Sequence, residues 1–325
     1  MAGSALLSRL SLPSLRWFAP ALVVDWAVVF TLAALGHYIQ DRPVFERDVA
    51  HYLAPFPDPA ISWPHKFVEQ VPANKNGMLD QITFYMPIVV FVVVGGLFRR
   101  SLHDVHHAVL GLWSSRELMR VTVEFIKNRV GRLRPDFLSR CAWSATLQAC
   151  TGDDWLVKDG RRSFPSGHSS TAWQGLLFLA LYVAGKNGAF AYFNPPIPSL
   201  IPLSGPRTSR LPPLLRSLLA SHLLRLILAC SPLVLAIWIP LTRLEDNYHH
   251  PTDVATGSFI GAVCALGGYL SYFPKPWRAA SVDEEVERRR GEPRRVYREQ
   301  ESEEVPDGRV RLLEEDEEAV VGVDV

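Results

Sequence analysis

Long apolar segments are the feature that most constrains what this chain can fold into. The clearest is residues 82–98, ITFYMPIVVFVVVGGLF, and arginines follow it directly. A helix of about 20 apolar residues spans the hydrocarbon core of a bilayer, where backbone polar groups must be satisfied internally. The other apolar segments are residues 21–39, 169–184, 218–241 and 254–272. These segments predict an all-α, polytopic membrane protein.

Residues 103–126 are harder to assign, because they mix apolar side chains with charged ones. An ion pair between Arg120 and Glu124, one helical turn apart, would ease burial of this segment inside a bundle. The alternative is an amphipathic helix that lies on the membrane surface. Hydropathy favours neither interpretation, so both stay open at this point.

Two of the apolar segments contain residues that change helix geometry or packing. Pro232 is expected to break the segment 218–241, because proline lacks the N–H that a helix interior uses. The last segment is rich in glycine, which permits close contact between helices. These glycines are Gly257, Gly261, Gly267 and Gly268.

The two ends of the chain differ from its apolar middle. Residues 1–20 contain arginines but no acid, which is typical of the cytosolic end of an uncleaved signal anchor. Residues 275–325 are dominated by Glu and Arg and predict a disordered cytosolic tail. We therefore expect a membrane domain at residues 21–274 between these two parts. The net charge of +1 gives no reason to expect a nucleic-acid partner.

Two polar stretches, far apart in the sequence, each stand directly before an apolar segment. They are Ser163–Ser170 (SFPSGHSS) and Thr242–Asp253 (TRLEDNYHHPTD), and a third, basic stretch is Lys127–Pro135 (KNRVGRLRP). The chain crosses the membrane at residues 169–184 and returns at 218–241. All three stretches therefore emerge on one face, which predicts a composite site there.

The side chains in these stretches suit a phosphate group. A phosphate monoester carries about two negative charges near pH 7 and needs cationic or N–H donors around its oxygens. Lys127, Arg134 and Arg243 can supply the cations. Ser166 and Gly167 open a helix, whose N–H groups and positive dipole end attract anions. Taken singly, each is more often a flanking charge or an ordinary cap, but their spacing, chemistry and membrane side agree.

Histidines in the same stretches supply reactive groups. His249 and Asp253 are four residues apart, so they face each other if Pro251 begins a helix. A carboxylate near one ring nitrogen orients the imidazole and leaves the other nitrogen nucleophilic. His168, at another helix start, can act as the acid for a leaving alkoxide. We exclude His250, because its offset to Asp253 is wrong by one residue.

The motifs K-x6-RP (127–135), PSGH (165–168) and R-x5-H-x3-D (243–253) resemble those of the type 2 phosphatidic acid phosphatase (lipid phosphate phosphatase) superfamily, in order and in spacing. The resemblance covers about residues 125–272. The order of the spans is similar to that of fungal diacylglycerol-pyrophosphate and lipid phosphatases. The resemblance implies an all-helical, six-transmembrane-helix bundle, which assigns residues 103–126 to the membrane. One departure is Thr242, where the family usually has serine; a hydroxyl is kept.

The resemblance also implies a role for each matched residue. His249 would be the nucleophile that forms a phosphohistidine, Asp253 would orient it, and His168 would protonate the leaving oxygen. The phosphoryl oxygens would be held by Lys127, Arg134, Ser166, Gly167 and Arg243. The family needs no metal, and we expect no cofactor.

Residues and resemblance together predict a hydrolase, an integral membrane phosphatase that acts on phosphatidate, lysophosphatidate or diacylglycerol pyrophosphate. The expected partners are therefore lipid phosphates and membrane lipids; the sequence assigns no oligomeric state. One alternative is a phosphatase of isoprenoid or dolichyl diphosphates, or of sphingoid-base phosphates. Another is a catalytically silent scaffold or transporter of the same family. The presence of every reactive residue argues against it. A vanadium haloperoxidase shares the motifs, but its soluble character does not fit six apolar segments.

Basic residues point to two opposite orientations in the membrane. The loop 127–162 is rich in Lys and Arg, which would place it in the cytosol. Several of these charges are expected to bind phosphate, however, and charges kept for chemistry are poor markers of topology. Residues 99–100, 186–216 and 275–278 carry basic groups on the opposite face. We therefore predict cytosolic termini and a site on the non-cytosolic face, in an endomembrane such as ER, Golgi or vacuole, or in the plasma membrane.

The cysteines fit this orientation. Cys141 and Cys150 lie together in a polar loop that the six-span arrangement places outside the cytosol, where a disulfide persists. We therefore favour a bond between them. Cys230 and Cys264 lie in apolar segments and are expected to be small core residues.

Overall fold

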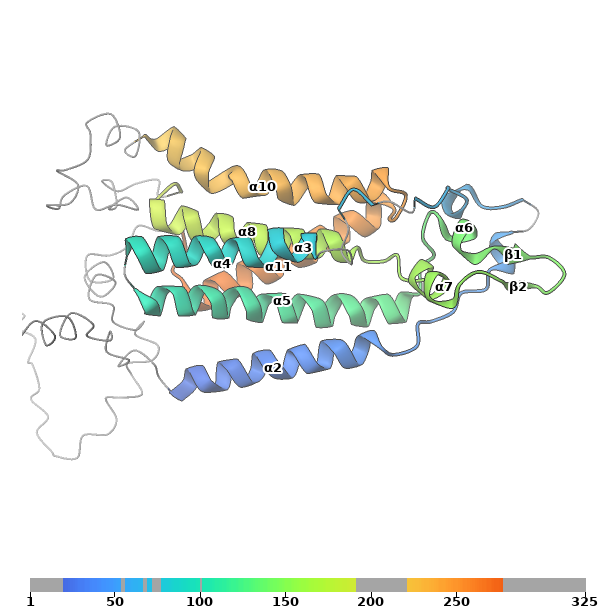
Figure 1. Ribbon diagram of the computed structural model, residues 1–325, viewed down its shortest axis with the longest axis horizontal. Coiled ribbons are helices and arrows are strands. Elements are labelled where there is room, and N and C mark those ends of the chain that lie inside the picture. Colours follow the sequence, from blue (N-terminus) through green and yellow to red (C-terminus); the bar gives the residue numbers. More distant parts are fainter. Residues whose placement is uncertain are drawn as a thin grey trace, which may run out of the picture.

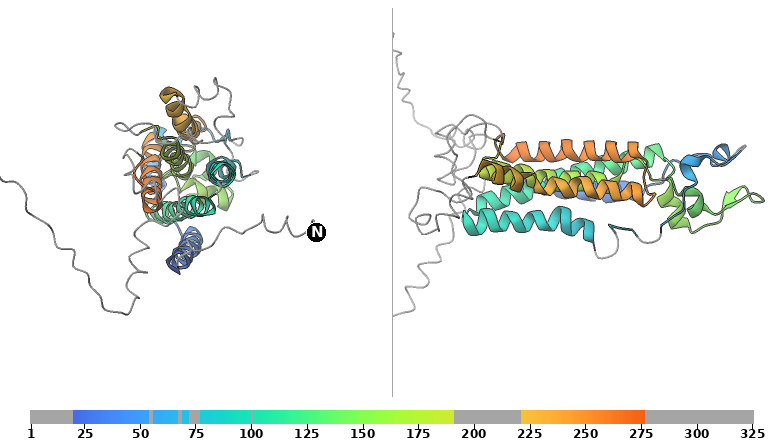
Figure 2. Two further views of the ribbon diagram at one scale, coloured as in Figure 1. Left: turned by 90° about the vertical axis from the view of Figure 1, so that its left-hand side faces the viewer. Right: turned by 90° about the horizontal axis from the view of Figure 1, so that it is seen from above.

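The structure is a computed structural model that describes residues 20–276, apart from residues 54–55, 67–68, 72–76, 100 and 191–220. Its long helices run side by side as one bundle, and a cap of short elements projects beyond one end (Figure 1, Figure 2). The bundle consists of α2 (Pro20–Gln40), α5 (Leu102–Val130), α8 (Gly167–Asn187), α10 (His222–Glu245), α11 (Pro251–Tyr272) and one composite helix made of α3 (Met78–Asp80), η4 (Gln81–Tyr85), α4 (Met86–Phe91) and η5 (Val92–Phe98). The cap and its approaches contain η2 (Ala50–Tyr52), η3 (Pro59–Ile61), α6 (Phe137–Cys141), α7 (Asp154–Gly160) and the antiparallel pair β1 (Trp143–Ser144) and β2 (Ala149–Cys150).

Within the described residues, four helices are long and apolar enough to cross a membrane: α2, the composite helix Met78–Phe98, α10 and α11. The other two long helices, α5 and α8, do not meet that criterion but lie in the same bundle. α5 packs against α2, α8 and α11. The prediction of a helical, multi-pass membrane protein agrees with this architecture, and the count of six spans stays a prediction.

Helix α8 forms the centre of the bundle. It packs against α10, α11 and α5, and its side chains Phe178 and Tyr182 are completely buried. They join Phe91 and Tyr269 in one apolar cluster. Large apolar side chains on the outer helices face outward instead, such as Phe259 on α11, which is 70% exposed. Apolar side chains on both the inside and the outside are what helices surrounded by lipid require.

Three of the four glycines of α11 lie at helix contacts, as the sequence predicts. A Cβ added at Gly257 would stand 2.4 Å from the Ser166 carbonyl oxygen, and one at Gly261 would stand 2.2 Å from that of Ser170. Both oxygens belong to the start of α8. Gly268 contacts α5 in the same way, whereas Gly267 has no such neighbour within 4 Å. The close approach of α11 to α8 therefore depends on two glycines one helical turn apart.

Replacing Gly261 by alanine is expected to destabilise the fold, because the new methyl group would overlap backbone that no rotamer change can move. Overpacking of this kind costs about 1–3 kcal/mol. The matched control is Gly267→Ala, where alanine meets no atom and the better helix propensity favours stability by up to about 1 kcal/mol. Thermal unfolding in detergent compares the two variants. Equal midpoints would contradict the packing described here.

Charged residues of α5 find partners other than the predicted one. Arg120 forms an ion pair with Glu117 at 3.0 Å and donates to the Ala33 carbonyl oxygen of α2 at 2.7 Å. Glu124 pairs with Arg162, which follows α7. The predicted Arg120–Glu124 pair is therefore wrong. The rotation of α5 in the bundle turns Arg120 toward α2 and Glu124 toward the cap.

Helix α10 continues through Pro232, so the predicted break is also wrong. A proline inside a helix leaves the carbonyl four residues earlier without its usual donor. Here that carbonyl belongs to Leu228, and it accepts a hydrogen bond from the Ser231 hydroxyl at 3.0 Å. A side chain thus satisfies the freed backbone group, which is how membrane helices tolerate proline.

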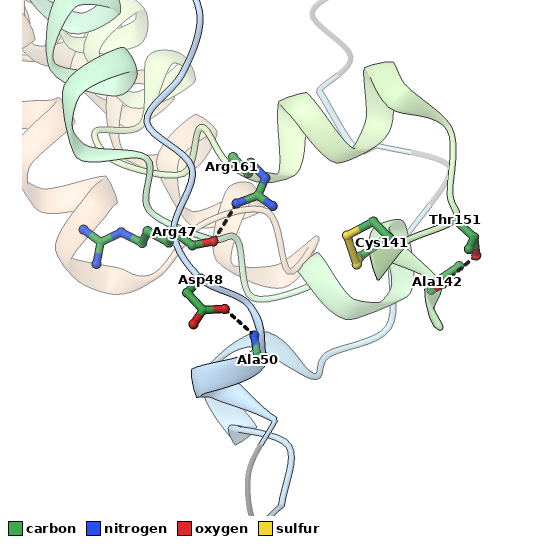
Figure 3. Close-up of a disulfide and its surroundings, with 8 residues drawn as sticks. Arg47, Asp48, Ala50, Cys141, Ala142, Thr151 and Arg161 are labelled. Carbon is green, nitrogen blue, oxygen red and sulfur yellow. Dashed lines mark hydrogen bonds between the residues drawn. A yellow bond between two sulfur atoms is a disulfide. The ribbon is translucent and has the colours of Figure 1, made fainter. Parts of the chain in front are cut away.

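A disulfide joins Cys141 at the end of α6 to Cys150 in β2, which confirms the pairing that the sequence favoured. Figure 3 shows the surroundings of this bond, including the Arg161 guanidinium, which donates to the Arg47 carbonyl oxygen at 2.9 Å. That contact ties the end of α7 to the connection between α2 and α3. The two remaining cysteines are free and partly buried in α10 and α11, as expected.

Several predictions concern residues that lie wholly or mostly outside the described part of the chain. They are the cytosolic segment 1–20, the basic loop 186–216 and the charged tail 275–325. These assignments stay predictions.

Candidate active site

The three predicted motifs meet at the end of the bundle that carries the cap (Figure 1). Helices α5 and α10 end there, and α8 and α11 begin there. The backbone N–H of Ser166, just before α8, donates to the Asp253 carbonyl oxygen in the first turn of α11 at 3.0 Å. The meeting of the stretches, inferred from the pattern of crossings, is thus observed.

Local sequence signals build the turns that position these residues. α5 ends at Gly131, whose φ of 56° is left-handed, and a Cβ there would stand 2.0 Å from the Phe45 carbonyl oxygen. This ending leaves Lys127 on the last helical turn. Ser166 is the N-cap of α8, and α11 begins at Pro251, as predicted. The hydroxyl and N–H of Ser166 therefore both take part in the fold.

Asp253 is completely buried, and its carboxylate gathers donors from three segments. Oδ2 accepts from the Ser163 hydroxyl at 2.6 Å and from the His250 backbone N–H at 3.0 Å, and Oδ1 accepts from Arg132 Nη1 at 2.6 Å. His249 Nδ1 lies 3.8 Å from Oδ2, longer than a hydrogen bond. His250 Nδ1 is closer, at 3.1 Å. The offset argument against His250 is therefore wrong, because His250 is the N-cap residue of α11 and Asp253 stands at the third helical position. The exclusion of His250 from catalysis stays a prediction.

His249 is 4% exposed, and its Nδ1 has no hydrogen-bond partner among the described residues. Burial lowers the pKa of this imidazole to about 4; Asp253 opposes the change and the positive charge of Arg134 adds to it. A lowered histidine pKa means that the ring is neutral at pH 7. The neutral ring keeps the lone pair that a nucleophile needs.

His168 is the second residue of α8, so it stands at the same end of the bundle as His249. Its Nε2 is buried and has no hydrogen-bond partner among the described residues. A carboxylate oxygen of Glu69 lies 3.8 Å away. Two imidazoles from different elements thus lie in one region, which is the arrangement that a nucleophile and a proton donor need.

Each of the three predicted cations forms an ion pair. The pairs are Lys127–Glu124 (3.0 Å), Arg134–Asp159 (2.9 Å), Arg243–Glu69 (2.9 Å) and Arg243–Asp246 (2.9 Å). The Lys127 Nζ also stands at Gly167, where an added Cβ would lie 3.0 Å from it. The structure therefore brings the predicted cations and the start of α8 together, but with carboxylates that sequence reasoning missed.

Asp159 shows how strongly the cations act on these carboxylates. Burial disfavours its charged form, yet Arg134 and Arg140 hold the pKa of this carboxyl below its usual range. The ring of Tyr248 faces the same arginines, with the Arg140 guanidinium 4.8 Å and that of Arg134 5.0 Å from its centroid. The site is thus a charged, hydrogen-bonded network at the end of an apolar bundle.

Sequence reasoning missed several residues of this network, among them Arg132, Ser163, Tyr248 and Glu69. Arg132 was counted only as a topology marker, although it stands inside the K-x6-RP motif. Ser163 opens the SFPSGHSS stretch. No local signal marks Glu69, which comes from the connection between α2 and α3. Among the described residues, no three His, Cys, Asp or Glu side chains are grouped to hold a metal ion.

Comparison with protein families finds one match, the PAP2 superfamily, over residues 108–277. This range contains all three motifs and is more than half of the chain. The chain belongs to the PAP2 superfamily. The predicted family is therefore confirmed, and with it the assignment of this PAP2 protein to the phosphoric monoester hydrolases.

Curated relatives of this PAP2 protein include plant and fungal proteins. The "Probable lipid phosphate phosphatase 4" of Arabidopsis thaliana is 30% identical over 78% of this chain and 73% of its own length. The "Probable diacylglycerol pyrophosphate phosphatase 1" of Schizosaccharomyces pombe is 32% identical over 67% of this chain and 70% of its own. The "Diacylglycerol pyrophosphate phosphatase 1" of Saccharomyces cerevisiae is 30% identical over 77% and 79%. No solved structure matches the chain.

Proposed function

We propose that this PAP2 protein is an integral membrane lipid phosphate phosphatase that hydrolyses phosphatidate, lysophosphatidate or diacylglycerol pyrophosphate through a phosphohistidine, without a metal ion. One observation carries the proposal: the imidazoles of His168 and His249 lie near each other at the end of a lipid-facing bundle, within the influence of the positive charges of Lys127, Arg134 and Arg243. The names of the relatives support the class of substrate. Residues 21–274 would form the six-span catalytic domain, between a cytosolic segment 1–20 and a charged cytosolic tail 275–325.

The first half-reaction transfers the phosphoryl group to the protein. His249 Nε2 attacks phosphorus, a P–N bond forms, and the bond from phosphorus to the lipid oxygen breaks. His168 gives a proton to that oxygen, so the lipid leaves as a neutral alcohol, or as phosphatidate when the substrate is diacylglycerol pyrophosphate. Asp253, held by Ser163 and Arg132, stabilises the positive charge that develops on His249.

The second half-reaction returns the enzyme to its starting state. A water molecule attacks the phosphohistidine, His168 takes a proton from that water, and the P–N bond breaks. Inorganic phosphate leaves, and His249 is neutral again. Throughout, Lys127, Arg134 and Arg243, with the N–H groups around Gly167, would neutralise the phosphoryl oxygens, which is the part that a metal ion has in other phosphatases.

The orientation in the membrane is also a proposal. We infer that the site lies on the non-cytosolic face of an endomembrane or of the plasma membrane. The disulfide between Cys141 and Cys150 lies in the cap, at the same end of the bundle as the site. Disulfides persist in oxidising compartments and are rare in the cytosol, so this bond supports that orientation.

A substrate panel on purified protein in excess EDTA tests the proposed function. Phosphate release is expected from phosphatidate, lysophosphatidate or diacylglycerol pyrophosphate, with inhibition by vanadate, whose oxyanion resembles the five-coordinate phosphorus. Loss of activity in EDTA with recovery on adding magnesium would contradict the metal-independent mechanism. Release only from isoprenoid diphosphates or sphingoid-base phosphates would assign those substrates instead. No release from any lipid would favour a silent scaffold.

A further inference from the structure

The connection between α2 and α3 is bound to the site rather than standing clear of it. His250 Nε2 lies 3.0 Å from the Ala60 carbonyl oxygen, and the Gln70 backbone N–H donates to Asp246 Oδ2 at 3.0 Å. These contacts join the connection to the last turn of α10 and to the start of α11. The sequence indicated only a polar, proline-rich linker here, so any functional side chain it supplies is unassigned.

Glu69 is the residue that this connection brings beside the proposed phosphate-binding residues. Its Oε2 lies 2.9 Å from Arg243 Nη1 and 3.8 Å from His168 Nε2. The side chain is 22% exposed. A carboxylate oxygen thus stands between a proposed phosphate-binding cation and the proposed proton donor. Under the proposed mechanism, an oxygen of the substrate phosphate has to occupy that same space.

Arg243 does not need Glu69 to hold its position. Its Nη2 is 2.9 Å from Asp246 Oδ2 and 3.0 Å from the Thr242 hydroxyl, and its side chain is completely buried. These contacts leave Nη1 as the nitrogen that meets Glu69. Removal of the Glu69 carboxylate therefore frees one donor of Arg243 without removing the groups that orient the guanidinium.

Charge decides the direction of the effect. A phosphate monoester carries about 1.5 to 2 negative charges near pH 7. It attracts Arg243 as Glu69 does, but it repels the Glu69 carboxylate beside it. Substrate and Glu69 cannot both bind the same donor, so one has to displace the other.

We propose that Glu69 competes with the substrate phosphate for Arg243 and thereby determines affinity: its carboxylate is displaced from Arg243 when a phosphoryl group binds. This rests on the proposed function, because it takes the space between Arg243 and His168 as the phosphoryl position. Glu69 thereby lowers the affinity of the site for phosphate groups, below the affinity that Lys127, Arg134 and Arg243 would give without it. The same holds for the product, inorganic phosphate.

Titration calorimetry tests the proposal without turnover. It measures the equilibrium binding of orthovanadate and of inorganic phosphate to the full chain in detergent. Glu69→Gln is expected to lower Kd for both anions by about tenfold or more, since like-charge juxtaposition is costly in a desolvated site. The matched control is Glu245→Gln, which removes an exposed carboxylate at the end of α10 that contacts Gln70. The Kd of Glu245→Gln for each anion is expected to stay within about twofold of the Kd of the unmodified chain. The loss of a charge at an exposed position has a small effect on binding elsewhere, because solvent screens it.

An unchanged Kd for Glu69→Gln would overturn the proposal, and a raised Kd would show that Glu69 positions Arg243 instead. If Glu69→Gln does not fold, Glu69→Ala carries the same expected direction. If neither the unmodified chain nor the variant binds orthovanadate or inorganic phosphate, the proposal is also overturned. Tighter anion binding by Glu69→Gln without hydrolysis of any lipid in the substrate panel would support Glu69 as a competitor while refuting the lipid phosphatase function.

Discussion

Replacing His249 by alanine is expected to abolish phosphate release and to remove the phosphorylated intermediate. His249 is buried and neutral at pH 7, so its ring keeps the lone pair that attack on phosphorus needs. No other histidine of the site combines these features with a position beside Asp253. Loss of a nucleophile in comparable hydrolases costs about 10⁶ in kcat, which leaves only residual catalysis by binding and charge stabilisation.

The measurement is rapid quenching of the enzyme with a lipid substrate labelled in its phosphate, followed by denaturing electrophoresis at neutral and acid pH. A phosphohistidine is acid-labile, so label should survive the neutral gel and disappear from the acid one. His250→Ala is the matched control. It removes the contacts of the His250 ring with Asp253 Oδ2 and with the Ala60 carbonyl oxygen, each of which contributes about 0.5–1.5 kcal/mol of stability, yet it should keep the labelled intermediate. Label in His249→Ala and none in His250→Ala would exchange the roles of the two residues.

Replacing Asp253 by asparagine is expected to lower kcat by about 10³–10⁴, similar to the loss of the orienting carboxylate in a catalytic triad. The carboxylate is completely buried and is the partner of Arg132, Ser163 and His250. The neutral amide would no longer stabilise a positive charge on His249. It would also leave the guanidinium of Arg132 without its ion-pair partner.

Two further variants separate orientation from simple folding. Ser163→Ala removes one donor to Asp253 Oδ2 and keeps the charge, so kcat should fall by about tenfold, in line with about 1–2 kcal/mol for one buried hydrogen bond. Arg132→Met keeps much of the side-chain length but removes the cation on Oδ1. All variants are first compared for thermal unfolding in detergent. If Asp253→Asn is folded and keeps more than a tenth of the activity, Asp253 does not orient the nucleophile.

Local interactions let the sequence alone determine where the helices lie and which of their ends carry chemistry. Each apolar segment marks the place of a helix, because a backbone in lipid has to bond within itself. Pro251 at the first position of α11 and Ser166 at the cap of α8 are signals within a few residues of the ends they mark. The parity of crossings then brings the three motifs to one end without any knowledge of packing.

Which side of a helix meets another helix was decided only by the tertiary structure. Arg120 pairs with Glu117 rather than Glu124, because the rotation of α5 against its neighbours selects the partner. Gly267 makes no helix contact although it resembles Gly261 in sequence. Both outcomes depend on which face of a helix meets another helix, and a composition of apolar and small residues does not specify that face.

The contacts of Asp253 and of Glu69 were likewise not predictable from the sequence. Spacing predicted that His249 and Asp253 come close, but not that Ser163 and Arg132 bond the carboxylate, 90 and 121 residues earlier in the chain. Glu69 reaches Arg243 across 174 residues. Such pairs form because the path of a loop over the end of the bundle places one charge beside an opposite charge. The packing of all the helices sets that path, and the neighbouring residues in the sequence do not.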